Sequence, residues 1–418
     1  MTQKRILLIG GNFYPELTGI GKYNGEMMEW LAEQGNTCTV ITTYPYYPDW
    51  KIKEPHYKKS YWFSKENKAV NSFPASPIKI YRCPHFVPAN PSGLTRILSD
   101  ISFCLSATVM VFILLFKKKY DYVITVSPPF LTGIYAIAYK KIKGAKFFYH
   151  VQDLQIDAAA DLQMIKSRVL IKLLFRIEKF IMRHADLISS ISEGMINRIK
   201  EKSGKNKISF FPNWVDTNIF YPLSEKSMLK EAFGFNSKDK IVLYSGAIGE
   251  KQGLEAIFYA ANSLKNISDL KFIICGSGPY KKKLEDLKAS LQIQNVTFMP
   301  LQPVEKLNAF LNMADVHLVI QKTNASDLVM PSKLTPILAV GGLAVITAPV
   351  QSTLFKIVNT NQIGILAEPE NEVALTNAIQ SALNPLNGNI TDNARNYAKK
   401  YLSINEILVK YTEDMAEA

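Results

Sequence analysis

Five residues in the second half of the chain have the types and spacing of a site for an anionic ligand. Gly246 ends a short apolar run and is followed closely by Lys251, while Gly276 ends the next apolar run. Ser332 and Lys333 stand at the expected start of a helix. Glycines let backbone N–H groups approach a ligand, and a helix N-terminus and lysines supply positive charge. If these stretches meet at the carboxyl ends of neighbouring strands they predict a diphosphate site, although each alone is also typical of an ordinary turn.

The start of the chain shows the same order of strand, glycine-rich turn and helix. An apolar run over 5–9 leads into a glycine pair, and the turn continues with Thr18, Gly19 and Gly21 before a helix expected over about 24–34. This turn matches neither the G-x-G-x-x-G dinucleotide fingerprint nor the P-loop, which argues against nicotinamide and ATP-hydrolysing sites. Two such turns in one chain indicate two nucleotide-fold halves facing one cleft.

The residues that bind metals or form disulfides lack the necessary spacing. The five histidines show no metal-ligand pattern, and the chain has no D-x-D pair to hold a divalent ion. We therefore expect a metal-independent site without a cofactor. The four cysteines lie far apart without a C-x-x-C motif, which is typical of reduced thiols in a cytosolic protein.

Length and charge set the broad class of the protein. With 418 residues the chain exceeds what one core of roughly 250 to 300 residues serves, so two domains are expected. Only 20% of the residues are charged, which argues against disorder. The net charge of +13 and pI near 9.3 indicate an anionic partner. No nucleic-acid-binding motif accompanies the lysines, so a phosphorylated small molecule or an anionic membrane fits better than nucleic acid.

Two segments are unusual for such a fold. Residues 101–116 are almost entirely apolar and are followed by the lysine run 117–119. Sixteen residues fall short of the roughly 20 that span a bilayer, so the segment is either a buried helix or one that lies in an anionic leaflet. Residues 44–77 are rich in Tyr, Pro and Lys and form an expected irregular insertion, whose length is typical of functional or mobile loops.

Strand-like apolar runs alternate with helical patterns along the whole chain, as in proteins with parallel sheets. After the first strand, the expected strands lie at 37–42, 78–82, 122–126, 145–150, 187–190, 207–211, 241–244, 271–275, 296–299, 316–320, 344–347 and 364–366. We therefore expect an α/β fold of two doubly wound, Rossmann-like domains that face a central cleft. The expected bounds are 1–211 for the first domain, 212–222 for a hinge, 223–395 for the second domain, and 396–418 for a C-terminal helix packed on the first domain.

A series of short motifs runs nearly from end to end of the chain. They are Pro15-Glu16 with Thr18-Gly19-Ile20-Gly21, Ser127-Pro128-Pro129, Val151-Gln152-Asp153-Leu154, Ser192-Glu193-Gly194-Met195, Pro212-Asn213-Trp214-Val215-Asp216, Lys251-Gln252-Gly253-Leu254 and Pro331-Ser332-Lys333-Leu334. In this order they resemble the retaining family-four glycosyltransferases of the GT-B fold, especially the subgroup that builds bacterial capsule, colanic-acid and O-antigen units.

The resemblance implies a UDP- or GDP-sugar donor held by the second domain. It places base contacts near Phe298 and diphosphate contacts around Gly246, Lys251 and the Ser332-Lys333 pair. Cations there would stabilise the charge that builds on the departing phosphate. The acceptor implied is a saccharide linked to polyprenyl diphosphate, met by the acceptor-side loop with Thr18 and by the segments 44–62 and 101–119. The enzyme would associate peripherally with the cytoplasmic face of the plasma membrane.

The chain departs from the family's motifs at the reacting sugar. The positions of the family's paired glutamates fall on Leu328 and Pro336, so Asp327, one residue away, is the candidate for the sugar-facing role. The family's His-Asp pair appears as Gln152-Asp153, which leaves Asp153 as a candidate to orient or deprotonate the acceptor hydroxyl. Glu16 is the competing candidate, and for both carboxylates the alternative is a capping or loop hydrogen bond.

Two mechanisms retain the anomeric configuration. A double displacement needs a carboxylate beneath the anomeric carbon, whereas front-face attack lets the leaving phosphate accept the proton. The sequence offers no clear candidate for that carboxylate, which favours the second mechanism. Two other functions remain open on the same fold. One is a sugar-nucleotide 2-epimerase, and the other is a catalytically silent subunit that binds the donor for a partner transferase.

Overall fold

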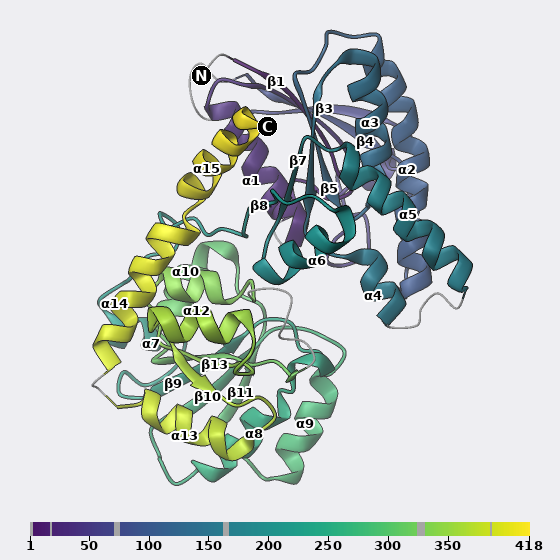
Figure 1. The fold of residues 1–418 in the computed structure, drawn as a ribbon. Coiled ribbons are helices and arrows are strands. Elements are labelled where there is room, and N and C mark those ends of the chain that lie inside the picture. The colour runs from purple at the N-terminus through teal and green to yellow at the C-terminus, as the bar shows by residue number, and fades with distance from the viewer. Residues whose placement is uncertain (1–2, 17–18, 71–75, 162–166, 324–330, 385–386) are drawn as a thin grey trace. The chain divides into compact units, whose positions relative to one another are not determined.

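The computed structural model describes residues 3–16, 19–70, 76–161, 167–323, 331–384 and 387–418, and its chain divides into two compact units (Figure 1). The first unit holds residues 1–212 and 408–418, and the second holds 213–407. The last residues join the first unit through α15 (Ile404–Glu417), where the Tyr411 ring stacks on Phe211 with 3.8 Å between centroids.

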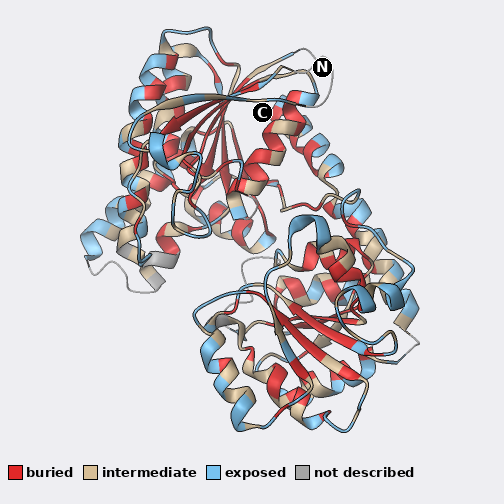
Figure 2. Cartoon of the chain, turned by 180° about the vertical axis from the view of Figure 1, so that it is seen from behind, coloured by how far each residue is buried: buried red, intermediate tan, exposed pale blue. Residues whose placement is uncertain are grey.

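An eight-stranded sheet forms the centre of the first unit, in the order β3-β4-β2-β1-β5-β6-β7-β8. The strands are β1 (Arg5–Ile9), β2 (Thr37–Thr43), β3 (Ser64–Lys68), β4 (Ile78–Cys83), β5 (Tyr122–Ser127), β6 (Lys146–Val151), β7 (Leu187–Ser190) and β8 (Ser209–Phe210). Every pair is parallel except β3 with β4. Because helices cover both faces, most strand residues are buried, which explains their continuous apolar runs (Figure 2).

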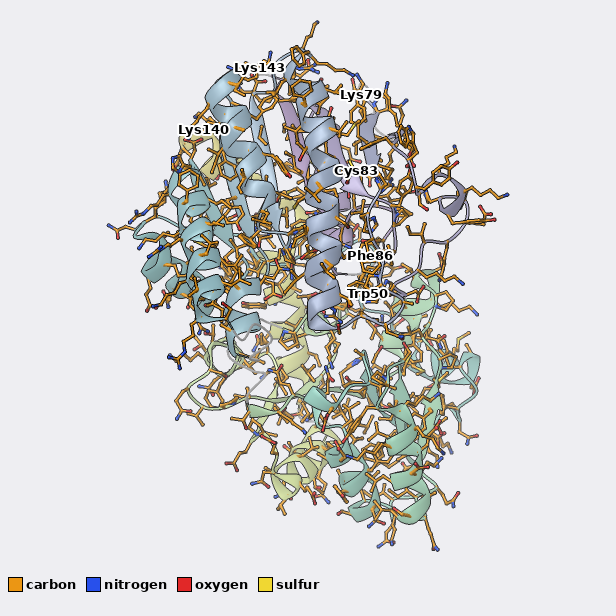
Figure 3. The ribbon with its side chains drawn as sticks, turned by 90° about the vertical axis from the view of Figure 1, so that its right-hand side faces the viewer. Trp50, Lys79, Cys83, Phe86, Lys140 and Lys143 are labelled. Atoms are coloured by element: carbon orange, nitrogen blue, oxygen red, sulfur yellow. The ribbon has the colours of Figure 1, made fainter. Side chains whose placement is uncertain are left out.

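The helices of the first unit connect successive strands. They are α1 (Gly19–Glu33), the short η1 (Tyr57–Lys59), α2 (Gly93–Leu115), α3 (Thr132–Lys143), α4 (Gln155–Asp161), α5 (Arg168–His184) and α6 (Glu193–Ser203). The helices α2, α3 and α5 lie on one side of the sheet (Figures 1 and 3). The Tyr135 hydroxyl joins α3 to α2 by donating to the Cys104 carbonyl at 2.5 Å, and Gly133 lets α3 approach Ile181 of α5 closely.

Three local expectations about this unit were wrong. The first helix begins at Gly19 rather than near 24, so Gly19 and Gly21 lie in its first turn. The apolar segment 101–116 belongs to a 23-residue helix, because Ser92 and Thr95 form a capping box well before the apolar run. The insertion 44–77 contains η1 and the edge strand β3, whose sequence Ser-Lys-Glu-Asn-Lys has no apolar run to announce it.

The second unit is built on a six-stranded parallel sheet in the order β11-β10-β9-β12-β13-β14. Its strands are β9 (Lys240–Ser245), β10 (Leu270–Cys275), β11 (Val296–Met299), β12 (Val316–Val319), β13 (Ala344–Thr347) and β14 (Ile365–Ala367). Its helices are α7 (Lys226–Ala232), η2 (Glu250–Gln252), α8 (Glu255–Ser263), α9 (Lys281–Ser290), α10 (Val304–Asn312), α11 (Leu334–Ala339), α12 (Thr353–Asn361), α13 (Glu372–Ala382), α14 (Gly388–Tyr397) and the π-helical turn η5 (Ala398–Leu402). Two Rossmann-like units are therefore confirmed.

Residues 213–222, expected as a hinge, form part of the second unit. The Val215 N–H donates to the Leu402 carbonyl at 2.8 Å. The Arg395 guanidinium on α14 donates to the carbonyls of Thr217 and Phe220. The chain therefore passes into the second unit directly after Pro212.

The close approach of α3 and α5 yields a stability prediction. A Cβ atom on Gly133 would lie 2.3 Å from Cγ2 of Ile181, so Gly133→Ala forces the helices apart and should cost about 1–3 kcal/mol of unfolding free energy. Gly388→Ala is the control, because nothing lies within 4 Å of the added atom. Urea denaturation measures both, and a Gly133→Ala midpoint equal to that of the control would contradict this packing.

Candidate functional site

Two loops of the second unit lie against each other at the carboxyl ends of β9 and β10. The Gly246 N–H donates to the Cys275 carbonyl at 2.9 Å, and the Ile248 N–H donates to the Ser277 carbonyl at 2.9 Å. A Cβ atom on Gly276 would lie 1.9 Å from the Gly246 carbonyl oxygen, so only glycine permits this spacing. The structure thus brings Gly246 and Gly276 together, at the edge where doubly wound sheets bind ligands.

Lys333 extends its ammonium group to the same loops. Its Nζ atom lies 4.0 Å from the centroid of the Tyr244 ring and 3.4 Å from the position of a Cβ on Gly246. The nitrogen is buried and has no hydrogen-bond partner among the residues that the structure describes. Burial lowers the pKa of Lys333 to about 7. A buried cation beside two glycine loops, with no carboxylate bonded to it in the described part of the chain, is suited to receive an anion.

The remaining residues predicted to bind the donor have different surroundings. Ser332 is exposed, and its carbonyl accepts from the Thr335 hydroxyl in front of the six-residue helix α11. Phe298 on β11 packs on Phe258 at 6.0 Å, with the Lys281 ammonium 5.6 Å from its ring centroid. Their contacts with a nucleotide stay predictions.

Of the residues predicted to form the site, one is described only in part and one is not described. Lys251 has its backbone in η2, just before Gly253, but its side chain lies outside the described part of the chain. Asp327 lies outside the described residues altogether. Their roles at the reacting sugar and the diphosphate therefore stay predictions.

Glu16 in the first unit is buried and fully engaged in hydrogen bonds. Its Oε1 accepts from the N–H groups of Tyr46 and Tyr47, both at 3.0 Å, and its Oε2 accepts from the Asn12 side chain at 2.9 Å. Burial raises the pKa of Glu16, and these hydrogen bonds oppose the rise. A Cβ on Gly21 would lie 2.5 Å from Oε2, so the glycine makes room for the carboxylate. Glu16 thereby holds two loops together.

Arg82 supports the same loops and was not singled out from the sequence. Its guanidinium is buried on β4 and donates to the Tyr14 carbonyl at 2.7 Å and the Thr43 carbonyl at 3.1 Å. Glu66 of the edge strand β3 pairs with it at 3.2 Å. An arginine near the end of the expected strand 78–82 was the available signal, because a buried guanidinium needs such partners.

The other candidates on the acceptor side lie nearer the surface. Asp153 is exposed in the segment between β6 and α4. Gly19 has φ of +61°, a conformation that glycine adopts without strain, and a Cβ there would lie 3.3 Å from the Tyr47 ring. Thr18 lies outside the described residues. Of the two proposed bases, Asp153 is therefore the one exposed to solvent and Glu16 the one enclosed.

The described residues also bear on metals, thiols and membranes. None of their His, Cys, Asp and Glu side chains gather in threes to hold a metal ion, and metal independence stays a prediction. The four cysteines are buried and free, as expected.

One helical stretch, Thr95–Leu115, is long and apolar enough to cross a membrane, and 39% of it is buried within the unit. Helices in the core of a protein can have the same length and composition, so these two properties do not make it a membrane-spanning helix.

Comparisons with known proteins identify the family to which both units belong. The pattern of the family described as Glycosyl transferase 4-like domain matches residues 18–214, and that of Glycosyl transferases group 1 matches residues 225–401. The putative colanic acid biosynthesis glycosyl transferase WcaI of Escherichia coli (strain K12) is 38% identical over 420 residues. The match covers 98% of this chain and 99% of WcaI.

Solved structures resemble the chain in fold. Sucrose-phosphate synthase from Thermosynechococcus elongatus has a TM-score of 0.72 and 18% identity, with 100% of both chains covered. Anabaena Alr3699/HepE in complex with UDP and glucose has a TM-score of 0.70 and 13% identity over 100% of both chains. WaaG, a glycosyltransferase involved in lipopolysaccharide biosynthesis, has a TM-score of 0.65 and 13% identity over 98% of both.

The unpaired ammonium of Lys333 leads to a prediction about stability and pH. Its pKa of about 7 lies below the ordinary 10.5, so between these values the unfolded chain binds more protons and stability rises with pH. Lys333→Met removes a buried charge without a partner and should stabilise the protein by about 1–3 kcal/mol at pH 6, and by less at pH 9.

Denaturant midpoints at the two pH values measure this effect. The exposed Lys306→Met on α10 serves as the control and should change stability by less than about 0.5 kcal/mol at either pH. A Lys333→Met variant that is less stable than the wild type at pH 6 would contradict the unpaired state of this ammonium.

Proposed function

The chain belongs to the glycosyltransferases that combine a 4-like domain with a group 1 domain, and on this basis we propose that it is a retaining, metal-independent enzyme. It transfers a sugar from a UDP- or GDP-sugar to a saccharide linked to polyprenyl diphosphate. The likeness to WcaI favours the synthesis of a surface polysaccharide such as colanic acid. The observation that carries the proposal is the unpaired Lys333 ammonium beside the Gly246 and Gly276 loops.

The donor's diphosphate is the natural partner of this ammonium. When the bond between the anomeric carbon and the phosphate oxygen breaks, negative charge builds on that oxygen. A cation already held in place, together with loop N–H groups, stabilises this charge without reorganising in the transition state. Binding the diphosphate keeps Lys333 protonated, so donor affinity should weaken as the pH rises above its free pKa of about 7.

We propose front-face attack as the route to retention. The acceptor oxygen bonds to the anomeric carbon on the face that the diphosphate leaves, and the acceptor's proton passes to the departing phosphate oxygen. This route needs no nucleophilic carboxylate beneath the sugar. It suits a chain in which the family's paired glutamates are replaced by Leu328 and Pro336. Asp153, which is exposed, would orient the acceptor hydroxyl.

A lipid-linked acceptor requires the enzyme to meet a membrane, and the outer side of α2 is suited to that. Its exposed apolar side chains recur every three or four residues and are Leu98, Ile101, Leu105, Val109, Phe112 and Phe116. Leu105 exposes 71% and Phe112 exposes 61% of their surface. Figure 3 shows α2 running along this side of the unit, so we name these six residues the apolar outer face. Contiguous exposed apolar patches are typical of interaction surfaces.

Positive charge around the apolar outer face favours an anionic bilayer over a protein partner. Lys140 and Lys143 are labelled beside the far end of α2 in Figure 3, and the run 117–119 follows that helix directly. The neighbouring helix α5 exposes Val169 and Leu173 among the basic residues Arg168, Lys172, Arg176, Lys179 and Arg183. Basic residues near an anionic surface contribute about 1 kcal/mol each. We propose that this side rests on the cytoplasmic leaflet of the plasma membrane.

The lysine run has a narrower role than the sequence suggested. The Lys119 carbonyl accepts from the Arg5 side chain at the amino end of β1, whereas Glu16 follows the carboxyl end. A 23-residue helix spans about 34 Å. The run therefore lies at the opposite end of the strands from the acceptor-side loop, and we propose that it contacts lipid headgroups.

The donor assignment is tested by assaying Lys251→Ala and Lys333→Met with UDP- and GDP-sugars. Each variant should lose at least tenfold in kcat/KM, because one charge-assisted hydrogen bond contributes about 1.5–3 kcal/mol. Lys306→Met is the matched control. Proton NMR of the product reports the anomeric configuration.

Three outcomes would count against the proposal. Undiminished transfer by both variants would remove the diphosphate site, and an inverted product would remove the front-face mechanism. Conversion of the donor to its epimer without any acceptor would identify an epimerase instead.

Membrane association is tested by flotation with vesicles of phosphatidylcholine containing about one third phosphatidylglycerol. Leu105→Glu with Phe112→Glu should reduce binding at least tenfold, because two charges would enter the apolar region. Val373→Glu is the control, since Val373 is also 70% exposed but lies on α13 of the second unit. Equal flotation of the double variant and the control, or no binding by the wild type, would contradict the docking surface.

A further inference from the structure

A cluster of polar and aromatic side chains in the first unit has hydrogen-bonding groups that nothing satisfies. It consists of Tyr46 and Trp50 after β2, His85 after β4, Asp100 on α2, and Gln155 at the start of α4. All but Asp100 follow the carboxyl ends of strands. Glu16 follows the carboxyl end of β1 and therefore lies at the same end of the sheet. We call it the His85 cluster. Figure 3 labels Trp50 beside the amino end of α2.

Both ring nitrogens of His85 are buried and have no hydrogen-bond partner among the described residues. Burial lowers the pKa of His85 to about 3, so the ring is neutral and offers one donor and one acceptor. The Oε1 atom of Gln155 is likewise buried and without a partner in the described part of the chain. Each such group costs about 1–3 kcal/mol unless a ligand or water satisfies it.

The rest of the cluster holds these groups in position. The His85 ring lies 4.9 Å from the Tyr46 ring, which in turn lies 5.2 Å from the Trp50 ring. The side-chain amide of Gln155 donates to the Asp100 carboxyl group. Because that carboxyl takes the amide N–H, the Oε1 atom of Gln155 is directed away from it and is free to accept.

Charge in the cluster favours a neutral ligand. The Arg96 guanidinium lies 5.1 Å from the centroid of the Trp50 ring and acts electrostatically on Asp100. Arg96 is exposed, whereas the unsatisfied groups of the cluster, the His85 ring nitrogens and the Oε1 atom of Gln155, are buried and uncharged. A neutral ligand with hydroxyl groups therefore matches these groups better than a phosphate does. Aromatic rings beside neutral donors and acceptors match the C–H faces and hydroxyl groups of a sugar.

We propose that the His85 cluster binds a pyranose ring of the acceptor saccharide. His85 and Gln155 bind adjacent hydroxyl groups, and the rings of Tyr46 and Trp50 pack on the apolar face of the sugar. The inference rests on the proposed function, because that function makes the acceptor a saccharide. It adds residues that recognise the acceptor sugar, a role that is assigned to neither Glu16 nor Asp153.

The test follows the Cε1–H resonances of the five histidines by NMR while octyl glucoside, galactoside, mannoside or N-acetylglucosaminide is added below its micelle concentration. At least one glycoside should shift the His85 resonance in a saturable manner and leave that of His317, which lies in the second unit, unchanged. If no glycoside moves the His85 resonance, the cluster holds only water and the inference is overturned.

His85→Phe separates binding from packing, because it keeps a ring beside Tyr46 and removes both nitrogens. The variant should be at least as stable as the wild type, yet its KM for the glycoside acceptor should rise about tenfold or more. Gln155→Leu should act in the same direction. His184→Phe on α5 is the matched control, since that ring contacts the Phe180 carbonyl outside the cluster.

Hydrolysis of the donor by water in the absence of acceptor distinguishes the two possible failures. If the wild type transfers sugar but His85→Phe has the acceptor KM of the wild type, the inference fails and the proposed function stands. If the glycoside binds but no donor is cleaved, the proposed function fails.

Discussion

Parallel pairing of strands is the constraint on which both units depend. In a parallel sheet the carboxyl ends of all strands meet at one edge, so loops distant in sequence become neighbours there. In the second unit this pairing places the Gly246 and Gly276 loops against each other, with the N–H of Gly246 bonded to the Cys275 carbonyl. In the first unit it brings Glu16, which follows β1, to the backbone N–H groups that follow β2.

Both proposed ligand sites rest on buried polar groups that have no hydrogen-bond partner among the described residues. Among the described residues the Lys333 ammonium and the His85 ring nitrogens have no partner, whereas the buried Arg82 is paired with Glu66 and two carbonyls. Arg82 is therefore a structural group that fixes the acceptor-side loops. The contrast distinguishes a residue that holds the fold from the residues for which we propose a ligand.

Helix α2 is apolar on both its buried and its exposed side. Phe103, Ala107 and Leu114 are buried on one side of the helix, while the apolar outer face is exposed on the other. A helix that is apolar all round is normally enclosed on every side. Within the described residues of the first unit, packing covers one side of α2 and leaves the apolar outer face exposed, which is the basis of the proposed contact with a membrane.

The strands, their order along the chain and the family follow from the sequence alone. Apolar runs of four to seven residues are strong local signals, and nearly all the expected strands agree with the structure to within a residue or two, β8 being the shortest at Ser209–Phe210. The polar strand β3 was missed because it pairs only at the sheet edge and needs no apolar run. The glycine loops after β9 and β10 were also recognisable, since their glycines and Lys333 occur in motifs.

Only the tertiary structure decided what each of those groups contacts. Whether Lys333 is paired, whether Glu16 is enclosed and which side of α2 is exposed depend on segments far away in the sequence. Burial and pairing set the charge state and the accessibility of a side chain, and neither is a local property. The sequence thus determined which chemical groups are present and on which elements, and the packing of distant elements determined which of them are free to act.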